Sequence, residues 1–286
     1  MSGQDTTLPL EVTLLVLLAA LMHASWNALV KASSSKFLDV VAINLVSATI
    51  AAATLPFLPA IDRACWPWLA ASVLLHQLYF AAVVGAYRFG DLSQAYPIMR
   101  GCAPMLVAVM GVLLLGEQLA ATMWAGVALI VLGIIAPALI AARGIRLPGR
   151  GTTVAAVNAV VIACYTLVDG VGARASGNSV GYGMWLFLLI AVPMAAFAVA
   201  WRGRELADYL RERWMLAAPG GALLMGSYLI VLWAMTQAPV AVVAALRETS
   251  VILAAIIGTV FLKERFGGWR IPGAALVTIG IAALNL

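Results

Sequence analysis

The sequence predicts an all-α integral membrane protein whose ten transmembrane helices form two inverted five-helix repeats. Three observations predict this fold class: an extreme apolar composition, ten apolar stretches of membrane-spanning length, and an internal repeat. Of the 286 residues, 64% are hydrophobic and 10% are charged, whereas about a quarter of the residues in ordinary globular proteins are charged. A soluble core could not bury so many apolar side chains, but lipid can surround them.

The apolar stretches set the number of spans. About 20 helical residues cross a bilayer core of about 30 Å. The connections between the stretches are too short to hold a folded domain, so we expect a multi-pass protein of the inner (plasma) membrane. No Lys or Arg precedes the first stretch, which argues for a retained helix rather than a cleaved signal peptide. The stretches lie at residues 10–30, 38–58, 66–88, 91–115, 119–141, 151–174, 180–201, 213–236, 239–262 and 268–286.

Lysine and arginine are unevenly divided between the two sides that alternating connections would reach. The loops after the odd-numbered spans carry thirteen of these residues, and the opposite side carries two, Arg63 and Arg174. Cytoplasmic loops of membrane proteins hold the excess of Lys and Arg. The division therefore predicts cytoplasmic odd-numbered loops and extracytoplasmic termini.

The second half of the chain repeats the first. A shift of 139 residues aligns Ser25-Trp26-Asn27 with Cys164-Tyr165-Thr166, and the change of shift further along implies a longer loop at Arg202–Arg213. Repeats with an odd number of spans enter the membrane in opposite orientations, which is characteristic of secondary transporters. The expected halves are residues 1–147 and 148–286, together one transport domain. A gapless shift of 147 aligns Arg100 with Arg247, Gly111 with Gly258, Glu117 with Glu264, Gly126 with Gly273 and Gly133 with Gly280.

Each repeat ends with a short motif that resembles the EamA family of the drug/metabolite transporter superfamily. The resemblance covers nearly the whole chain and implies a ten-helix carrier of small metabolites, linked to protons or another gradient and often an exporter. Some members export aromatic and other amino acids, so an aromatic or neutral amino-acid exporter is the leading expectation. A multidrug or other metabolite carrier of the same superfamily is the alternative. The matching segments are Leu115-Gly116-Glu117-Gln118-Leu119 with Gly126 and Gly133, Leu262-Lys263-Glu264-Arg265-Phe266 with Gly273 and Gly280, and Ser25-Trp26-Asn27 with Lys31.

Three ionisable residues are expected near the membrane midplane, where charge is costly and marks function. Arg100 and Arg247 each lie about nine residues into oppositely directed spans, so their depths converge. Either guanidinium could hold a substrate carboxylate through forked bonds, or be paired internally. Glu248 could answer Arg100 across the repeat interface or carry a coupling proton. Two positive groups and one negative group leave a need for one anion, which a zwitterionic or carboxylate substrate, or an internal partner, would meet.

Aromatic and polar side chains are expected to line a cavity at the same depth. The i, i+3, i+4 spacing puts His23, Trp26 and Asn27 on one helical face. Aromatic rings could stack on an aromatic substrate or hold its ammonium group by cation–π attraction, although each residue alone could be packing. We expect the first, third, fourth, sixth, eighth and ninth spans to bound the cavity, with the Gly-spaced fifth and tenth peripheral. The further candidates for substrate binding are His76, Tyr79, Tyr96 and Tyr165.

Two prolines flank Arg100 in the fourth span. Pro97 and Pro104 each remove a backbone donor, which kinks a helix and frees carbonyl groups. Kinked helices are common around transport sites, so we expect these prolines to act in gating, although prolines in membrane helices are also ordinary.

Other classes of protein are disfavoured by what the sequence lacks. It contains no H-E-x-x-H, G-x-S-x-G or Walker A motif, which argues against a membrane-embedded enzyme and an ATP-driven pump. No repeated filter sequence suggests a channel, and three dispersed cysteines suggest neither a metal site nor disulfides. We therefore expect no enzyme activity, cofactor, metal or nucleic-acid partner, and a monomer that binds a small molecule within the lipid bilayer.

Overall fold

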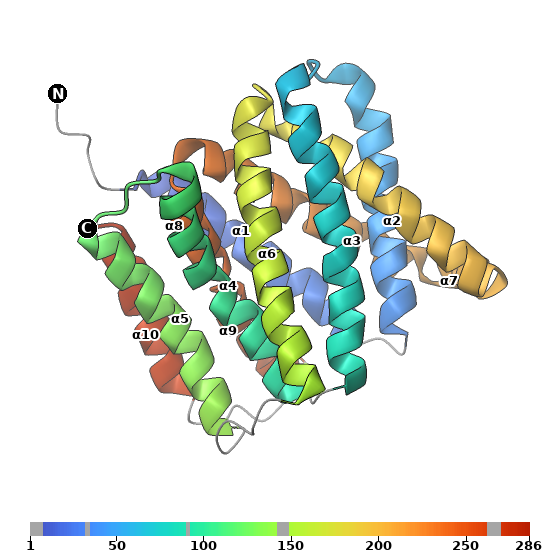
Figure 1. Cartoon of the computed structure of the whole chain (residues 1–286). Coiled ribbons are helices and arrows are strands. Elements are labelled where there is room, and N and C mark those ends of the chain that lie inside the picture. The colour runs from blue at the N-terminus through green and yellow to red at the C-terminus, as the bar shows by residue number, and fades with distance from the viewer. Residues whose placement is uncertain (1–7, 32–34, 90–91, 142–148, 262–269) are drawn as a thin grey trace.

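A computed structural model of the chain describes residues 8–31, 35–89, 92–141, 149–261 and 270–286, and this part is helical without strands. The all-α fold class is therefore confirmed. The helices, which Figure 1 shows in order along the chain, are α1 (Leu10–Lys31), α2 (Lys36–Thr54), η1 (Leu55–Phe57), η2 (Arg63–Cys65), α3 (Trp66–Phe89), α4 (Leu92–Leu115), α5 (Ala121–Ala141), α6 (Arg150–Ala175), α7 (Ser179–Gln237), α8 (Val240–Arg247), α9 (Ser250–Phe261) and α10 (Arg270–Leu284).

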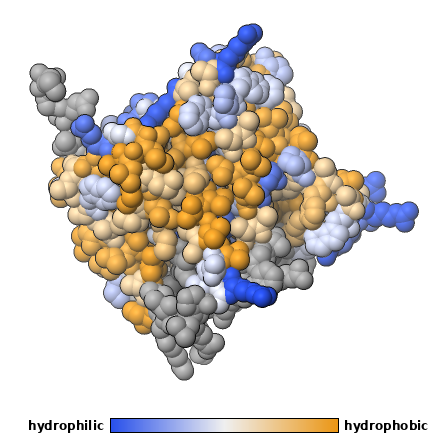
Figure 2. Space-filling view, viewed as in Figure 1, coloured by the Kyte–Doolittle hydropathy of each residue, from blue (hydrophilic) through white to orange (hydrophobic). Residues whose placement is uncertain are grey.

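The outer surface is suited to lipid. Large apolar side chains such as Leu113 and Val260 are exposed, at 75% and 64%. Figure 2 shows an apolar band across the visible face, with hydrophilic side chains toward its edges. Among the described residues, five helical stretches are long and apolar enough to cross a membrane, and shorter apolar helices accompany them. The protein is a multi-pass membrane protein; the count of ten spans stays a prediction.

Helix contacts follow the internal repeat. If the second half repeats the first, α6 corresponds to α1, the second arm of α7 to α3, and α8 with α9 to α4. The packing of α3 against α6 then has its counterpart in the packing of α7 against α1. The packing of α4 against α6 likewise matches that of α8 and α9 against α1. The centre of the molecule is therefore formed jointly by the two repeats.

The glycine-spaced helices α5 and α10 lie side by side (Figure 1). A Cβ atom added to Gly133 would lie 2.7 Å from the Gly273 carbonyl oxygen, and one added to Gly126 would lie 2.8 Å from that of Gly280. Only glycine allows two backbones to approach so closely. This pair of helices packs at the periphery, as expected from its glycine spacing.

Two regions differ from the sequence-based prediction. The expected loop at Arg202–Arg213 is helical, and α7 is interrupted by non-helical angles at Arg202, from which its two arms double back on each other. This segment forms a helix because Leu206 is buried and the Tyr209 hydroxyl donates to Asp39, 2.6 Å away. The ninth span, expected to be one helix, is instead divided into α8 and α9.

Candidate functional site

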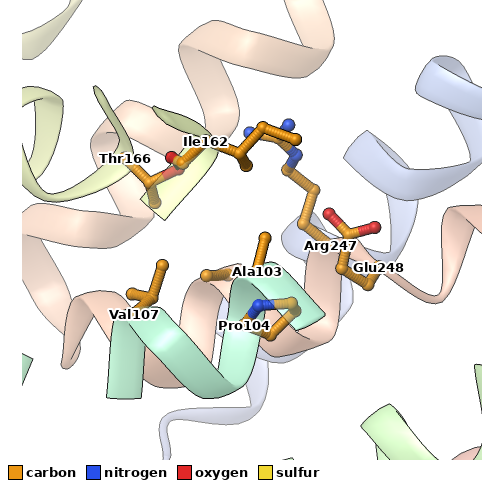
Figure 3. Close-up of a pocket in the computed structure, with 8 residues that line it drawn as sticks. Ala103, Pro104, Val107, Ile162, Thr166, Arg247 and Glu248 are labelled. Carbon is orange, nitrogen blue, oxygen red and sulfur yellow. Dashed lines mark hydrogen bonds between the residues drawn. The ribbon is translucent and has the colours of Figure 1, made fainter. Parts of the chain in front are cut away.

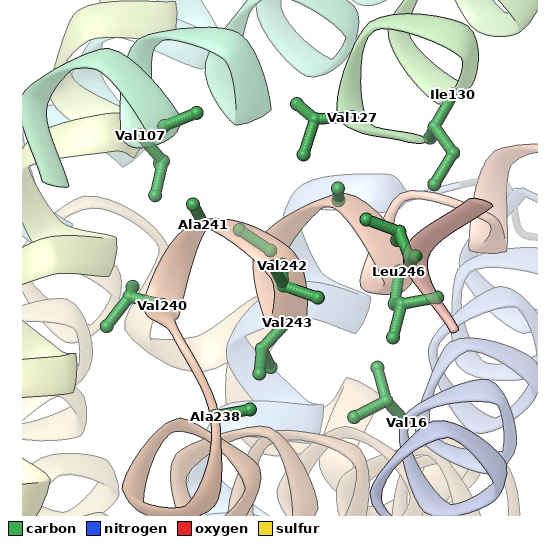
Figure 4. Packing of buried hydrophobic residues seen from close by; sticks show 14 of the residues in the cluster. Val16, Val107, Val127, Ile130, Ala238, Val240, Ala241, Val242, Val243 and Leu246 are labelled. Atoms are coloured by element: carbon green, nitrogen blue, oxygen red, sulfur yellow. The ribbon is translucent and has the colours of Figure 1, made fainter. Parts of the chain in front are cut away.

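The break between α8 and α9 places charged residues inside the protein. Helix α8 ends at Arg247, and α9 begins at Ser250 after a turn formed by Glu248 and Thr249. Every residue of α8 is buried, and Figure 4 shows its apolar side chains packed against Val16, Val107, Val127 and Ile130. The backbone of the turn stays hydrogen-bonded, because the amides of Glu248 and Thr249 donate to the Ala245 and Leu246 carbonyls, each at 3.1 Å.

Glu248 forms an ion pair with Arg100 across the interface between the repeats. The Arg100 Nε atom of α4 lies 3.0 Å from the Glu248 Oε2 atom, and the two side chains are only 7% and 5% exposed. Of the two roles left open for Glu248, the structure therefore shows pairing. The positive charge of Arg100 therefore has a negative partner within the protein.

His23 of α1 completes this group of side chains. Its Nε2 atom lies 3.3 Å from Arg100 Nη2, and the Trp26 indole nitrogen lies 3.3 Å from its Nδ1 atom. Guanidinium and indole nitrogens can only donate, and a neutral imidazole has a single acceptor nitrogen, so His23 can accept a hydrogen bond from only one of these two groups at a time. Asn27 instead donates to the His23 backbone carbonyl at 2.7 Å, so its amide helps to hold the local helix.

Arg247 differs from Arg100 in its partners. It is 7% exposed, and its Nε atom has no hydrogen-bond partner among the described residues. Its guanidinium carbon lies 5.7 Å from the ring centroid of Tyr228, a cation–π contact. Figure 3 shows its side chain extending away from the Glu248 carboxylate, toward the side of the pocket where Ile162 and Thr166 lie.

The pocket beside Arg247 is small and lies between the repeats. Its volume is about 10 Å³, which is room for about one water molecule. It is lined from α4, α6 and α8, and from the break after α8, by Ala103, Pro104, Val107, Ile162, Thr166, Ala244, Arg247 and Glu248.

Of the two prolines in α4, the structure places only the side chain of Pro104. Pro104 lines this pocket, and because proline has no N–H group, it leaves the Arg100 carbonyl without its helical donor. The helix continues through both prolines, and the interruption lies at the matching depth of the other repeat. The side chains of Tyr96 and Pro97 lie outside the described residues.

Aromatic rings form a second group, which contacts Arg247 through Tyr228. His76 of α3 stacks on Tyr165 of α6 with ring centroids 4.3 Å apart, and Tyr79 meets Tyr165 edge-on at 5.8 Å. The His76 ring is also 6.2 Å from Tyr228 of α7. The sequence-derived candidates thus fall into two groups, one around Arg100 and one around Tyr165. Two consecutive residues at the end of α8 connect them, because Glu248 contacts the first group and Arg247 lies beside the second.

Sequence reasoning missed Asp169 of α6, which is fully buried. Its Oδ1 atom accepts from the Tyr182 hydroxyl at 2.9 Å, and its Oδ2 atom accepts from the Tyr228 hydroxyl. The balance of two positive groups and one negative group was therefore incomplete, because Asp169 adds a second buried carboxylate. An ionisable residue inside an apolar stretch was the available signal.

Sequence reasoning also missed a pair of charged residues, Glu117 and Arg174, that lies at the beginning of α8. The Glu117 carboxylate accepts from the Val240 and Ala241 backbone amides at 2.8 and 3.4 Å, which caps the beginning of α8. Arg174 lies 3.1 Å from the same carboxylate and donates to the Met235 and Ala238 carbonyls. These contacts tie the first repeat to the second at the ends of α4, α6 and α7.

The fold and the site define a class of protein. Two repeats that build a common centre, an interrupted helix and buried charges at the interruption are features found in membrane transporters. The profile of the EamA-like transporter family matches residues 11–137 and 149–286. The chain belongs to this family, within the drug/metabolite transporter superfamily, and is a membrane transporter of small molecules.

A solved crystal structure that is 17% identical in sequence has the same fold, with a TM-score of 0.71 over 99% of this chain and 96% of that chain. A search of curated proteins gives no significant match.

Proposed function

We propose that this transporter is a secondary carrier of amino acids or similar carboxylates, in which Arg247 receives the substrate carboxylate. The observation that supports this proposal is the different state of the two repeat-related arginines. Arg100 forms an ion pair with Glu248 at 3.0 Å, whereas among the described residues no carboxylate lies within ion-pair distance of Arg247, and the Arg247 side chain borders a pocket. A buried guanidinium gains most from an anion that it can bind in forked geometry.

The surroundings of Arg247 favour a substrate with an apolar or aromatic side chain. Ala103, Val107 and Ile162 provide apolar contacts in the pocket, and Tyr228 and Tyr165 provide ring faces next to it. A cationic drug would bring its charge to a buried guanidinium, which is unfavourable. An aromatic or neutral amino acid therefore suits the site better than the multidrug alternative.

Transport requires the two repeats to move relative to each other. A pocket of about 10 Å³ cannot hold an amino acid, so the helices around it must separate before substrate enters. In alternating access, residues 1–147 and 148–286 would rock about the central site, between two states of similar free energy. The contacts of Glu117 with Arg174 and with the start of α8 would close one side in the present state.

Counterflow in proteoliposomes tests the proposed substrate class. The purified protein is reconstituted with a high internal concentration of one unlabelled compound, and entry of the same labelled compound is followed. We expect exchange of neutral and aromatic amino acids, and none of nucleosides or cationic drugs. Exchange of cationic drugs without exchange of amino acids would refute the proposal and favour the multidrug alternative.

A further inference from the structure

The pocket between the repeats is lined by groups of opposite charge. The Arg247 guanidinium and the Glu248 carboxylate both border it, and they belong to consecutive residues at the end of α8. Figure 3 shows the Arg247 side chain extending away from the Glu248 carboxylate, so the positive and negative groups are separated. Apart from Thr166, the other lining residues are apolar. The pocket therefore has a positive side and a negative side within apolar walls.

The Glu248 carboxylate has room for a second donor. It is 4% exposed, and its ion pair joins the Arg100 Nε atom to Oε2 at 3.0 Å. Among the described residues, no hydrogen bond is made to its Oε1 atom. An ionised carboxylate can accept at about four lone-pair sites. A ligand in the pocket could therefore donate to Glu248 while the ion pair with Arg100 persists.

Thr166 adds an acceptor rather than a donor to the pocket. Its hydroxyl hydrogen is donated to the Ile162 carbonyl oxygen, 2.7 Å away, so the hydroxyl oxygen offers only lone pairs to a ligand. One donor group, Arg247, therefore lines the pocket together with two acceptor groups, Glu248 and Thr166. A simple carboxylate brings only acceptors and would match Arg247 alone.

The buried charges around the pocket already balance. Counted by formal charge, the helices that line it hold, among the described residues, two buried arginines and two buried carboxylates, which are Arg100, Arg247, Asp169 and Glu248. A zwitterion leaves this balance unchanged, whereas a simple carboxylate adds one negative charge without a partner. Since an uncompensated charge in a buried site is costly, the balance favours a ligand of zero net charge.

We propose that the substrate carries an ammonium group beside its carboxylate, and that Glu248 receives this ammonium group. The inference rests on the proposed function, in which Arg247 receives the carboxylate. An ammonium group supplies three N–H donors, which are what the acceptors of the pocket need. The substrate class thereby narrows from carboxylates in general to zwitterionic amino acids.

The proposed contact also acts on the interface between the repeats. Glu248 belongs to the second repeat, and its present partner Arg100 belongs to α4 of the first. An ammonium group that shares the Glu248 carboxylate weakens this ion pair, because the same negative charge then attracts two cations. Substrate binding would thus loosen a contact between the halves that must separate. A carboxylate without an ammonium group would leave the contact at full strength.

Comparison of L-phenylalanine with 3-phenylpropionate, which lacks only the ammonium group, tests the proposal. Both unlabelled compounds compete with labelled L-phenylalanine for exchange in wild-type proteoliposomes. We expect L-phenylalanine to compete about ten- to a hundredfold better, as one charge-assisted contact implies. Equal competition would overturn this inference and leave the proposed function in place, because both compounds keep the carboxylate. If the wild type exchanges no L-phenylalanine, the proposed function fails and this inference with it.

A double variant assigns the preference to Glu248. Arg100→Gln/Glu248→Gln removes both charges of the ion pair, so neither is left buried and unpaired. It should bind L-phenylalanine and 3-phenylpropionate with similar affinity, as measured by titration calorimetry in detergent. The matched control Arg202→Gln/Glu205→Gln removes an ion pair whose side chains are 39% and 52% exposed, and it should keep the wild-type preference.

An unchanged preference in Arg100→Gln/Glu248→Gln would contradict the proposal, because the ammonium group would then be recognised elsewhere. The comparison in the wild type needs no variant, so it can still refute the proposal if the double variant fails to fold.

Discussion

The two repeat-related arginines have different physical roles because only one has a carboxylate in contact. Arg100 and Glu248 neutralise each other in a site that is almost fully buried. A buried ion pair adds little net stability, since desolvation offsets the attraction, but loss of one partner leaves an uncompensated charge. Arg247 has Tyr228 rather than a carboxylate beside it. Of the two arginines left open for substrate recognition, we therefore propose Arg247.

Substitution of Arg100 should impair folding before it impairs recognition. We expect Arg100→Gln to lower the free energy of unfolding by about 3–5 kcal/mol, because it leaves Glu248 charged and buried. The double variant Arg100→Gln/Glu248→Gln should recover most of this loss. Thermal unfolding of the purified proteins in detergent measures both. A single variant as stable as the wild type would show that the ion pair is not what holds Glu248.

Part of the site could be predicted from residue types alone. Arg100, Arg247 and Glu248 stand out as charges within apolar stretches, and the same rule would have found Asp169. The pairing of Glu248 with Arg100 was one of two alternatives that the sequence left open, because the choice depends on how the helices are rotated toward each other. The contact between Tyr228 and Asp169 joins residues that are 59 positions apart, and no sequence spacing indicates it.

At the scale of helices, the closest packing is between α5 and α10. We expect Gly133→Ala to destabilise the protein by about 1–3 kcal/mol, because the added methyl group would press on the Gly273 backbone. Gly149→Ala is the matched control, since nothing lies within 4 Å of its Cβ position. Thermal unfolding of the two variants should therefore separate them. Equal stability would mean that α5 and α10 do not pack as described.

The glycine spacing predicted that α5 and α10 are peripheral, but two other features of the helices escaped prediction. The break after Arg247 contains neither proline nor glycine, so local sequence gives no helix-ending signal there. It is supported instead by tertiary contacts, chiefly the ion pair of Glu248 with Arg100. The helical segment after Arg202 was predicted as a loop because the shift between the repeats changes there, yet Leu206 is buried against neighbouring helices.

At the scale of the whole molecule, the orientation in the membrane is a prediction from charge. The loops after odd-numbered spans hold thirteen Lys and Arg residues against two on the other side. Single cysteines introduced at Gly3 and at Gly149, in a protein without its native cysteines, are treated with an impermeant maleimide in intact cells. Labelling at position 3 alone is expected. Labelling at position 149 alone would reverse the orientation and leave the fold unaffected.

The central claim is that a substrate carboxylate contacts Arg247, and the preference for an acid over its amide tests it most directly. L-phenylalanine and its amide are compared as competitors of labelled L-phenylalanine exchange in proteoliposomes. The wild type should prefer the acid about ten- to a hundredfold, as one charge-assisted contact of about 1.5–3 kcal/mol implies. Arg247→Gln should lose this preference, while Arg211→Gln, at an exposed position, should keep it. Equal competition by acid and amide in the wild type, or an unchanged preference in Arg247→Gln, would contradict the claim.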